Sequence, residues 1–261
     1  MGALAAMSGT PGDAMGGAGM GSAGMSGIGT NPGAADWSCL GAPPTATPGV
    51  SGSGNVRYAV LVRSLSGLPI NNLVVRSCET ADLSCASPLS EGRGISPEGL
   101  AELEVPIGFA GFLELEMDAH VPTLVYMRRP VLHDMVELRP ILPIPEAALA
   151  QLSGLLNIEI LPELGILTLS ALDCRGERSP GASFSNNLGG RNFYFIAGLP
   201  NLMSASTDIQ GLGGFVNVPQ RLVEVSASVA ADGRLIDTRT LYPRPGWIVA
   251  VALAPPSLPV D

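Results

Sequence analysis

The chain has four cysteines, and their spacing along the sequence indicates which of them can pair as disulfides. Cys78 and Cys85 flank a short polar turn, residues 79–84, so a bond between them would close a local loop. This pairing leaves Cys39 to join Cys174, which would attach the N-terminal segment to a strand far along the chain. The even count favours two disulfides, each stabilising the fold by about 2–4 kcal/mol. Buried free thiols and a metal site are the alternatives, but no C-x-x-C pair and no neighbouring histidine favours a metal.

Four glutamates alternate with apolar residues in two short segments. Glu102 and Glu104 lie in the first segment, and Glu114 and Glu116 lie in the second. Because the side chains of a strand alternate between its two faces, this spacing predicts an acidic outer face over an apolar inner one. If the two strands pair as a hairpin, the like charges lie near each other at a small energetic penalty. The acidic face is either solvated or a patch for a cation or a basic partner, and its spacing does not match a calcium loop.

Two tryptophans, Trp37 and Trp247, carry the only rings large enough to form a platform for a sugar. Packing in the core or at a domain junction is the alternative for each of them. The two histidines, His120 and His133, accompany no nucleophile elbow and no H-E-x-x-H motif. We therefore predict no catalytic residue, no metal ligand and no cofactor, and the chain is predicted not to be an enzyme.

The composition excludes several classes of protein. The chain has 261 residues and a net charge of −9 at pH 7, and all 14 of its cationic side chains are arginines. An acidic balance argues against nucleic-acid binding, which needs a clustered basic surface. Without lysine there is neither a Schiff base nor a P-loop. No apolar run approaches the roughly 18 residues of a membrane span, so no transmembrane helix is predicted.

The N-terminal segment differs in composition from the rest of the chain. Residues 1–36 hold 11 glycines, eight alanines and five methionines, and no aromatic side chain. Such a segment buries too little apolar surface to offset its ordering entropy, so a disordered Gly/Met-rich tether and linker is predicted over residues 1–54. The start does not resemble a signal peptide, and we expect an export signal upstream of it, as in a tethered lipoprotein.

The remaining chain has the pattern of an all-β protein, in which short apolar runs are separated by Gly, Pro and Asn turns. One stretch differs, since leucines at helical spacing follow Pro145 and Glu146 and predict a helix of about ten residues. This helix, residues 146–157, would join a first β-sandwich domain at 55–145 to a second at 158–256. Strands are expected at residues 56–64, 73–77, 101–105, 112–117, 124–126, 165–172, 182–184, 193–196, 214–218, 222–228, 235–242 and 247–252.

The two predicted domains look like one unit used twice, because a turn, a strand, a proline turn and a second strand occur in each. The second half carries the pattern Thr207-Asp208-x-x-Gly211-x-x-x-Phe215-x-x-Val218-Pro219. The first half has Ser96 and Glu98 at the positions of the threonine and the aspartate. This pattern resembles the carboxypeptidase regulatory-like domain, a prealbumin-like (transthyretin-like) β-sandwich. The resemblance implies two tandem non-catalytic modules of an exported protein, and some relatives in that family bind starch-like glycans.

The sequence therefore predicts a non-catalytic structural or adhesive binding protein that is secreted or tethered at the outer surface or in the periplasm. Its partner would be a component of the cell envelope, either a protein or a glycan. A carbohydrate-binding accessory module is the alternative function. Neither a nucleic acid nor a cofactor is expected.

Overall fold

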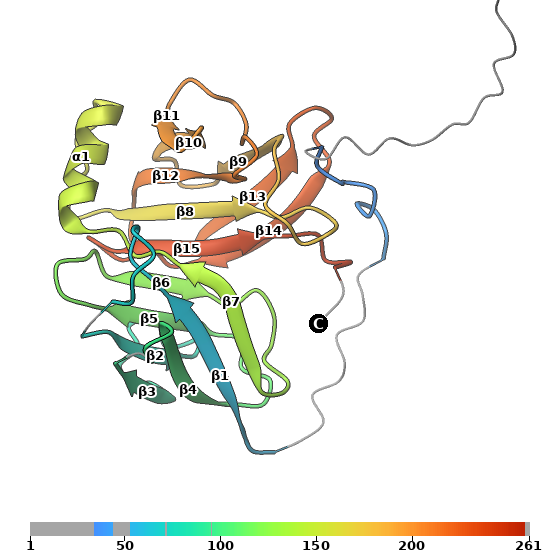
Figure 1. Ribbon diagram of the computed structural model, residues 1–261. Coiled ribbons are helices and arrows are strands. Elements are labelled where there is room, and N and C mark those ends of the chain that lie inside the picture. The colour runs from blue at the N-terminus through green and yellow to red at the C-terminus, as the bar shows by residue number, and fades with distance from the viewer. Residues whose placement is uncertain (1–33, 44–52, 71, 95, 259–261) are drawn as a thin grey trace, which may run out of the picture. The chain divides into compact units, whose positions relative to one another are not determined.

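All but one of the described helices and strands are β-strands (Figure 1). The computed structural model describes residues 34–43, 53–70, 72–94 and 96–258. The predicted all-β sandwich class is confirmed, because the short apolar runs form strands throughout both halves of the chain. Most of the predicted tether, residues 1–54, lies outside the described residues.

The first half folds into two sheets that share no strand. Its strands are β1 (Asn55–Val62), β2 (Val74–Cys78), β3 (Ser90–Arg93), β4 (Leu100–Pro106), β5 (Phe112–Glu116), β6 (Thr123–Tyr126) and β7 (Met135–Ile141). β1 is the centre of a three-stranded sheet, antiparallel to β4 and parallel to β7. In the other sheet, β5 lies between β2 and β6, and β3 lies at the edge.

Alternate side chains of the two sheets form the apolar core of the first half. On β1, Tyr58, Val60 and Val62 are almost fully buried. They belong to the same cluster as Leu113 and Leu115 of β5, which come from the other sheet. The two-residue period of a strand therefore directs one face of each sheet into a shared core, as in other β-sandwiches.

The second half repeats the pairing scheme of the first. Its strands are β8 (Gly165–Ala171), β9 (Ala182–Asn186), β10 (Arg191–Ile196), β11 (Leu199–Asn201), β12 (Leu212–Val218), β13 (Val223–Val229), β14 (Leu235–Leu241) and β15 (Ile248–Leu253). β8, like β1, has an antiparallel and a parallel neighbour, here β12 and β15. β13, like β5, lies between two antiparallel neighbours, β9 and β14. The domain boundaries at 55–145 and 158–256 stay a prediction.

β15 joins strands of both halves into one sheet (Figure 1). It runs parallel to β8 on one side and parallel to β6 on the other, with Ile248 opposite Thr123 and Ala250 opposite Val125. The resulting nine-stranded sheet has the order β11-β10-β12-β8-β15-β6-β5-β2-β3. Both halves belong to one compact unit, Gly33–Asp261. Backbone hydrogen bonds as well as side chains therefore hold the halves together.

The predicted helix is present as α1 (Glu146–Leu156), the one α-helix among the described residues. Pro145 is its N-cap, and Asn157 ends it in the left-handed conformation at a φ of 50°. Leu156 is buried, and Leu149 and Leu152 pack into the same cluster against strands of the second half. The leucines at helical spacing thus face the sheet, as expected. No helix in the described part of the chain is long and apolar enough to cross a membrane.

Three strands, β3, β7 and β11, were not predicted from the sequence. β3 has no apolar side chain, β7 is mostly exposed and contains Pro140, and β11 has three residues. All three lie at the edges of their sheets. An edge strand needs a partner on one side only and tolerates proline and charge, so it does not have to show an apolar alternation.

Residues 34–43, which belong to the predicted tether, are folded onto the second half. The Asp36 backbone N–H donates to Oδ2 of Asp173 at 3.0 Å, and the Asp36 carbonyl accepts from the Cys174 N–H at 2.8 Å. A disulfide between Cys39 and Cys174 adds a covalent link. The prediction of disorder is wrong for residues 34–43. The hydrogen bonds and the disulfide offset the entropy lost on ordering this stretch, which its few apolar side chains could not do.

Candidate functional site

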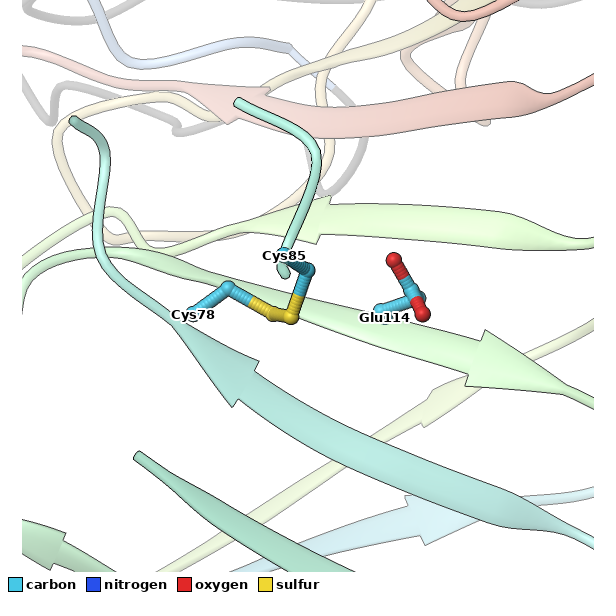
Figure 2. A group of neighbouring side chains, drawn as sticks. All are labelled: Cys78, Cys85 and Glu114. Atoms are coloured by element: carbon cyan, nitrogen blue, oxygen red, sulfur yellow. A yellow bond between two sulfur atoms is a disulfide. The ribbon is translucent and has the colours of Figure 1, made fainter. Parts of the chain in front are cut away.

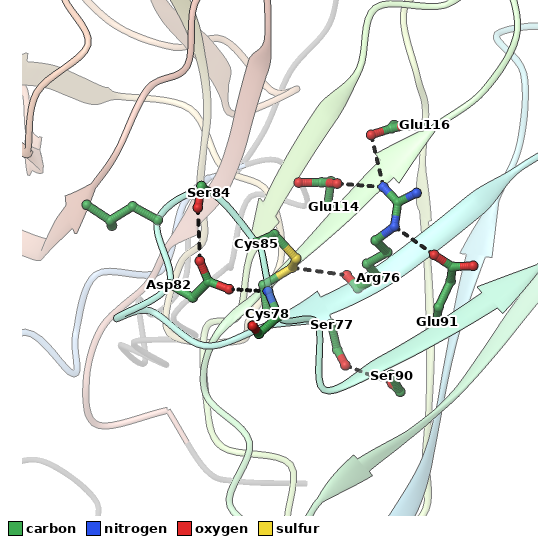
Figure 3. The surroundings of a disulfide bond; sticks show 12 residues. Arg76, Ser77, Cys78, Asp82, Ser84, Cys85, Ser90, Glu91, Glu114 and Glu116 are labelled. Carbon is green, nitrogen blue, oxygen red and sulfur yellow. Dashed lines mark hydrogen bonds and ion pairs between the residues drawn. A yellow bond between two sulfur atoms is a disulfide. The ribbon is translucent and has the colours of Figure 1, made fainter.

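All four cysteines form disulfides, in the arrangement that their spacing favours. Cys39 is bonded to Cys174, 135 residues away, with a Cα–Cα distance of 5.7 Å. Cys78 is bonded to Cys85, seven residues away, with a Cα–Cα distance of 5.4 Å (Figure 3). Both distances lie in the ordinary range for a disulfide. The shorter link closes the loop of residues 79–84 next to β5, and this loop forms one wall of the candidate site.

A hollow of about 410 Å³ lies between this loop and the segment that leads into β15. We call it the junction hollow, because both halves of the chain line it. Its polar and aromatic lining consists of Asp82, Ser84, Gln220, Tyr242, Arg244 and Trp247. The lining thus places two aromatic rings beside several hydrogen-bonding side chains.

Arg244 is held in place at the floor of the junction hollow by contacts with both halves. Its guanidinium lies 4.9 Å from the ring centre of Trp247 and 5.5 Å from that of Phe112. Nε donates to the Leu83 carbonyl at 3.0 Å, and Nη1 donates to Oε2 of Glu114 at 2.5 Å. Nη2 is buried and has no hydrogen-bond partner among the described residues. Ring stacking and one buried ion pair therefore fix the orientation of this side chain.

Glu114 is buried, although the sequence pattern predicted an exposed acid. Its carboxylate accepts from Arg244 of the second half and, at 2.7 Å, from Nη1 of Arg76 on β2. The same arginine also bonds to Glu91 and Glu116 (Figure 3). These hydrogen bonds, with that of Glu91 contributing most, raise the pKa of Arg76 above its ordinary value. Arg93 also pairs with Glu91, at 2.7 Å, so six charged side chains from β2, β3, β5 and the segment before β15 form one network.

The four glutamates of the predicted acidic face do not share a face. Glu102 and Glu104 are exposed on β4, in the three-stranded sheet. Glu114 and Glu116 are on β5, in the nine-stranded sheet. The prediction of one acidic face is wrong because the chain crosses from one sheet to the other between these strands, so they do not pair as a hairpin.

Cys78, Cys85 and Glu114 bring two sulfurs and a carboxylate within 4.8 Å of one another (Figure 2). This grouping is not suited to a cation. Both sulfurs are used in the disulfide and cannot act as thiolates. The carboxylate already accepts hydrogen bonds from two guanidinium groups, whose charge would repel a metal ion.

Asp82, the carboxylate of the junction hollow, is occupied by hydrogen bonds from its own loop. Oδ2 accepts from the Ser87 backbone N–H at 2.8 Å, and Oδ1 accepts from the Ser84 hydroxyl at 3.1 Å. Hydrogen bonds from the backbone of Ser87 and Ala86 lower the pKa of Asp82. This carboxylate can accept a hydrogen bond from a ligand but is a weak base at neutral pH.

The two candidate stacking residues lie at opposite ends of β14. Trp247 lines the junction hollow, after β14. Trp37 is partly buried on the docked N-terminal segment, and its carbonyl accepts from Arg234, just before β14, at 3.2 Å. Arg244 and Gln220 were not predicted as site residues. The sequence Pro243-Arg-Pro-Gly-Trp247, in which prolines surround a cation next to one of two tryptophans, is the signal that could have indicated Arg244.

The fold and the hollow together define a class: an all-β protein of two sandwich-like halves joined edge to edge, with a hollow at the seam. No protein-family model and no curated protein matches the sequence.

Three solved structures illustrate what the chain is similar to, each over 77% of its length. The Bacillus anthracis TIE protein is 14% identical with a TM-score of 0.25, and the match covers 33% of that protein. The shaft pilin SpaA from Lactobacillus rhamnosus GG is 9% identical with a TM-score of 0.24, and the match covers 98% of that pilin. A streptococcal ancillary pilin is 12% identical with a TM-score of 0.23 and 68% covered. The chain spans about a third of the length of the first of these.

Proposed function

We propose that this chain is an exported, non-enzymatic protein with a structural or adhesive role at the cell envelope. The observation that carries the proposal is the pair of disulfides, which uses all four cysteines. Disulfides persist in oxidising compartments outside the cytoplasm and are rare inside it. The longer one joins an N-terminal segment to the second half, so it has the function of a structural link.

The way the halves are joined supports a structural role. The parallel pairing of β6 with β15 and the ion pair between Glu114 and Arg244 both cross the seam. Such contacts oppose hinge motion between the halves. A body of this kind suits a spacer or a binding platform better than an enzyme that closes over its substrate.

The chemistry of the junction hollow supports binding rather than catalysis. A general base works best when its pKa lies near the working pH, and that of Asp82 is lowered instead. Glu114, below the hollow, is neutralised by two arginines. Both carboxylates are therefore arranged to fix the structure.

We further propose that the chain consists of two tandem carboxypeptidase regulatory-like modules. It would belong to a tethered lipoprotein that contacts an envelope protein or glycan. The recurring strand-pairing scheme supports the two modules. The glycine-rich composition of residues 1–36 supports the tether.

The test is to fractionate cells that make the natural protein and to count thiols in the denatured, unreduced chain from each fraction. We expect the protein outside the cytoplasm with no free thiol, and four thiols after reduction as the control. A cytoplasmic protein with four free thiols would refute the proposal.

Carbohydrate binding is the second candidate function, and the junction hollow is the observation that favours it. Trp247 supplies an aromatic ring, while Gln220 and Asp82 supply hydrogen-bonding groups beside it. Binding of starch-like and envelope glycans to Trp247→Ala and Gln220→Ala variants tests this. Both should lose binding that a Trp37→Ala variant keeps, whereas absence of glycan binding by the unaltered protein would remove this candidate.

A further inference from the structure

Residues 34–43 form a strap that is folded onto the second half, and we keep this name for the segment (blue in Figure 1). The strap contacts three separate segments of that half: Cys174 in the turn after β8, Arg234 just before β14, and Ser257 after β15. All of the strap lies in the described part of the chain, and none of it belongs to a sheet. Its attachment is therefore separate from the sheets that hold the body together.

Most polar contacts of the strap are made by exposed groups. The Ala34 carbonyl accepts from Nη2 of Arg175 at 3.1 Å, and the Trp37 carbonyl accepts from Nη1 of Arg234 at 3.2 Å. Both arginine side chains are close to half exposed, at 46% and 48%. Because water competes for such hydrogen bonds, each of them stabilises the docked strap only a little.

The apolar contacts of the strap are also limited. Trp37 and Leu40 pack against the core cluster of the second half, but both stay partly exposed. Asp36 adds one hydrogen bond to a buried carboxylate, that of Asp173. These contacts have to offset the backbone entropy that the whole strap loses when it docks. The disulfide lowers that entropic cost by holding the strap near its site, so the docked position depends on it.

The two disulfides of the chain differ in how easily a reductant can reach them. Cys78 and Cys85 are buried, at 0% and 8% exposed, whereas Cys39 and Cys174 are both partly exposed. Thiol–disulfide exchange needs a thiolate to reach a sulfur, so a reductant in solvent reaches the bond of the strap first. Cys78 and Cys85 are also only seven residues apart, so their thiols would stay close together and re-form the bond readily.

We propose that the disulfide between Cys39 and Cys174 is a redox-sensitive latch, which a dithiol reductant opens while the bond between Cys78 and Cys85 stays closed. In the closed state the strap is docked. In the open state the strap leaves, which exposes the ring of Trp37 and the apolar surface beneath it. The chain before the strap is then joined to the body at β1 instead of at the second half. The latch is a property of the folded, oxidised chain and does not depend on a role at the cell envelope.

One hydrogen bond indicates which sulfur the reductant attacks. The backbone N–H of Cys39 donates to Sγ of Cys174 at 3.0 Å. Such a donor stabilises a thiolate on Cys174 and makes this sulfur the better leaving group. We therefore expect the attack to occur at Sγ of Cys39.

The exchange takes place in two steps. The first thiolate of the dithiol attacks Sγ of Cys39, the bond between the two protein sulfurs breaks, and its electron pair stays on Sγ of Cys174. The second thiolate of the dithiol then attacks the reductant's own sulfur in the mixed disulfide and releases Cys39 as a thiolate. The dithiol is oxidised to a disulfide, the two cysteines are reduced, and two protons pass from the dithiol to the cysteines.

The experiment treats the oxidised full chain with dithiothreitol for increasing times, blocks free thiols with iodoacetamide and identifies the blocked cysteines by mass spectrometry. We expect Cys39 and Cys174 to be blocked about tenfold faster or more than Cys78 and Cys85, since exchange requires access to the sulfur. Equal rates, or earlier blocking of Cys78 and Cys85, would rule out the latch. Glutathione, which has one thiol, should be trapped as a mixed disulfide on Cys39, and trapping on Cys174 would refute the direction of attack.

The fluorescence of Trp37 tests whether the strap leaves. In the Trp247→Phe variant, Trp37 is the remaining tryptophan, and its emission should shift to longer wavelength as Cys39 and Cys174 are reduced. Trp37→Phe, which keeps Trp247, is the matched control and should show no shift at that stage. Far-UV circular dichroism should stay unchanged. An unshifted Trp37 would mean that noncovalent contacts suffice to hold the strap, and loss of the strand signal would mean general unfolding; either result would overturn the proposal.

Discussion

The carboxylate of Glu114 is predicted to couple the two halves of the molecule. Glu114 is 5% exposed and Arg244 is 9% exposed, and Arg76 bonds to the same carboxylate. Glu114→Gln would leave two guanidinium groups facing a neutral amide. We expect the free energy of unfolding to fall by about 3 kcal/mol, as in other buried ion pairs that lose one partner. Since Arg76 keeps its bonds to Glu91 and Glu116, most of the loss should arise at Arg244.

The complementary change, Arg244→Met, leaves Glu114 paired with Arg76. We expect a smaller loss of about 1–2 kcal/mol, from the stacking on Trp247 and the hydrogen bond to the Leu83 carbonyl. The variant with both substitutions leaves neither charge unpaired. Its loss should be smaller than the sum of the single losses by about 1–2 kcal/mol, because side chains in contact are not independent.

Urea denaturation of the oxidised protein measures all three variants. Glu102→Gln is the matched control, since Glu102 is 52% exposed on its side chain and lies 3.7 Å from Arg57. A surface pair of this kind should change stability by less than about 0.5 kcal/mol. If the two single losses add to within about 0.5 kcal/mol, or if Glu114→Gln is as mild as the control, the proposed coupling is refuted.

Three further predictions concern stability. Replacing both Cys39 and Cys174 by alanine should lower the free energy of unfolding by about 5 kcal/mol in urea, from the loop-entropy relation for a 135-residue separation; an unchanged value would contradict it. Gly214→Ala should prevent folding or lower Tm strongly, because the added Cβ would collide with a backbone oxygen of β8. Gly154→Ala has open space around the added Cβ and should stabilise α1 by about 0.5–1 kcal/mol. Burial acts to raise the pKa of Asp173, but its hydrogen bonds outweigh burial and hold this pKa below the ordinary value of 3.8. The carboxylate therefore stabilises the fold above pH 3.8, and this contribution is lost as the pH falls further. Asp173→Asn should therefore lower stability at pH 7 and flatten its decline below about pH 4, and a decline identical to that of the unaltered protein would count against this reading.

Local sequence patterns were enough to predict most strands, the helix and the disulfide between Cys78 and Cys85. The two-residue alternation of Tyr58, Val60 and Val62 specifies one buried face whatever the neighbouring strand is. The positions of Cys78 and Cys85 around a short turn restrict their pairing in the same local way. Features that depend on neighbours in sequence are visible without knowledge of the tertiary structure.

The candidate site could not be predicted, because it depends on which segments meet across the seam. Alternation places Glu114 on the outer face of its strand, but it does not show that the segment around Arg244 covers that face. Likewise, nothing between Glu104 and Glu114 indicates that the chain changes sheets there. Partners distant in sequence decide whether an outward-facing carboxylate is solvated or buried.

The position of β15 has a consequence for the order in which the chain can assemble during its synthesis. β15 is the last strand of the described chain, yet it lies between β8 and β6 and completes the seam. Until it emerges, the earlier-made β6 and β8 each present an unpaired edge, and such edges promote association with other chains. A growing chain would therefore keep these two edges open to association with its neighbours until β15 is available, which gives a chaperone that shields strand edges a time window in which to act.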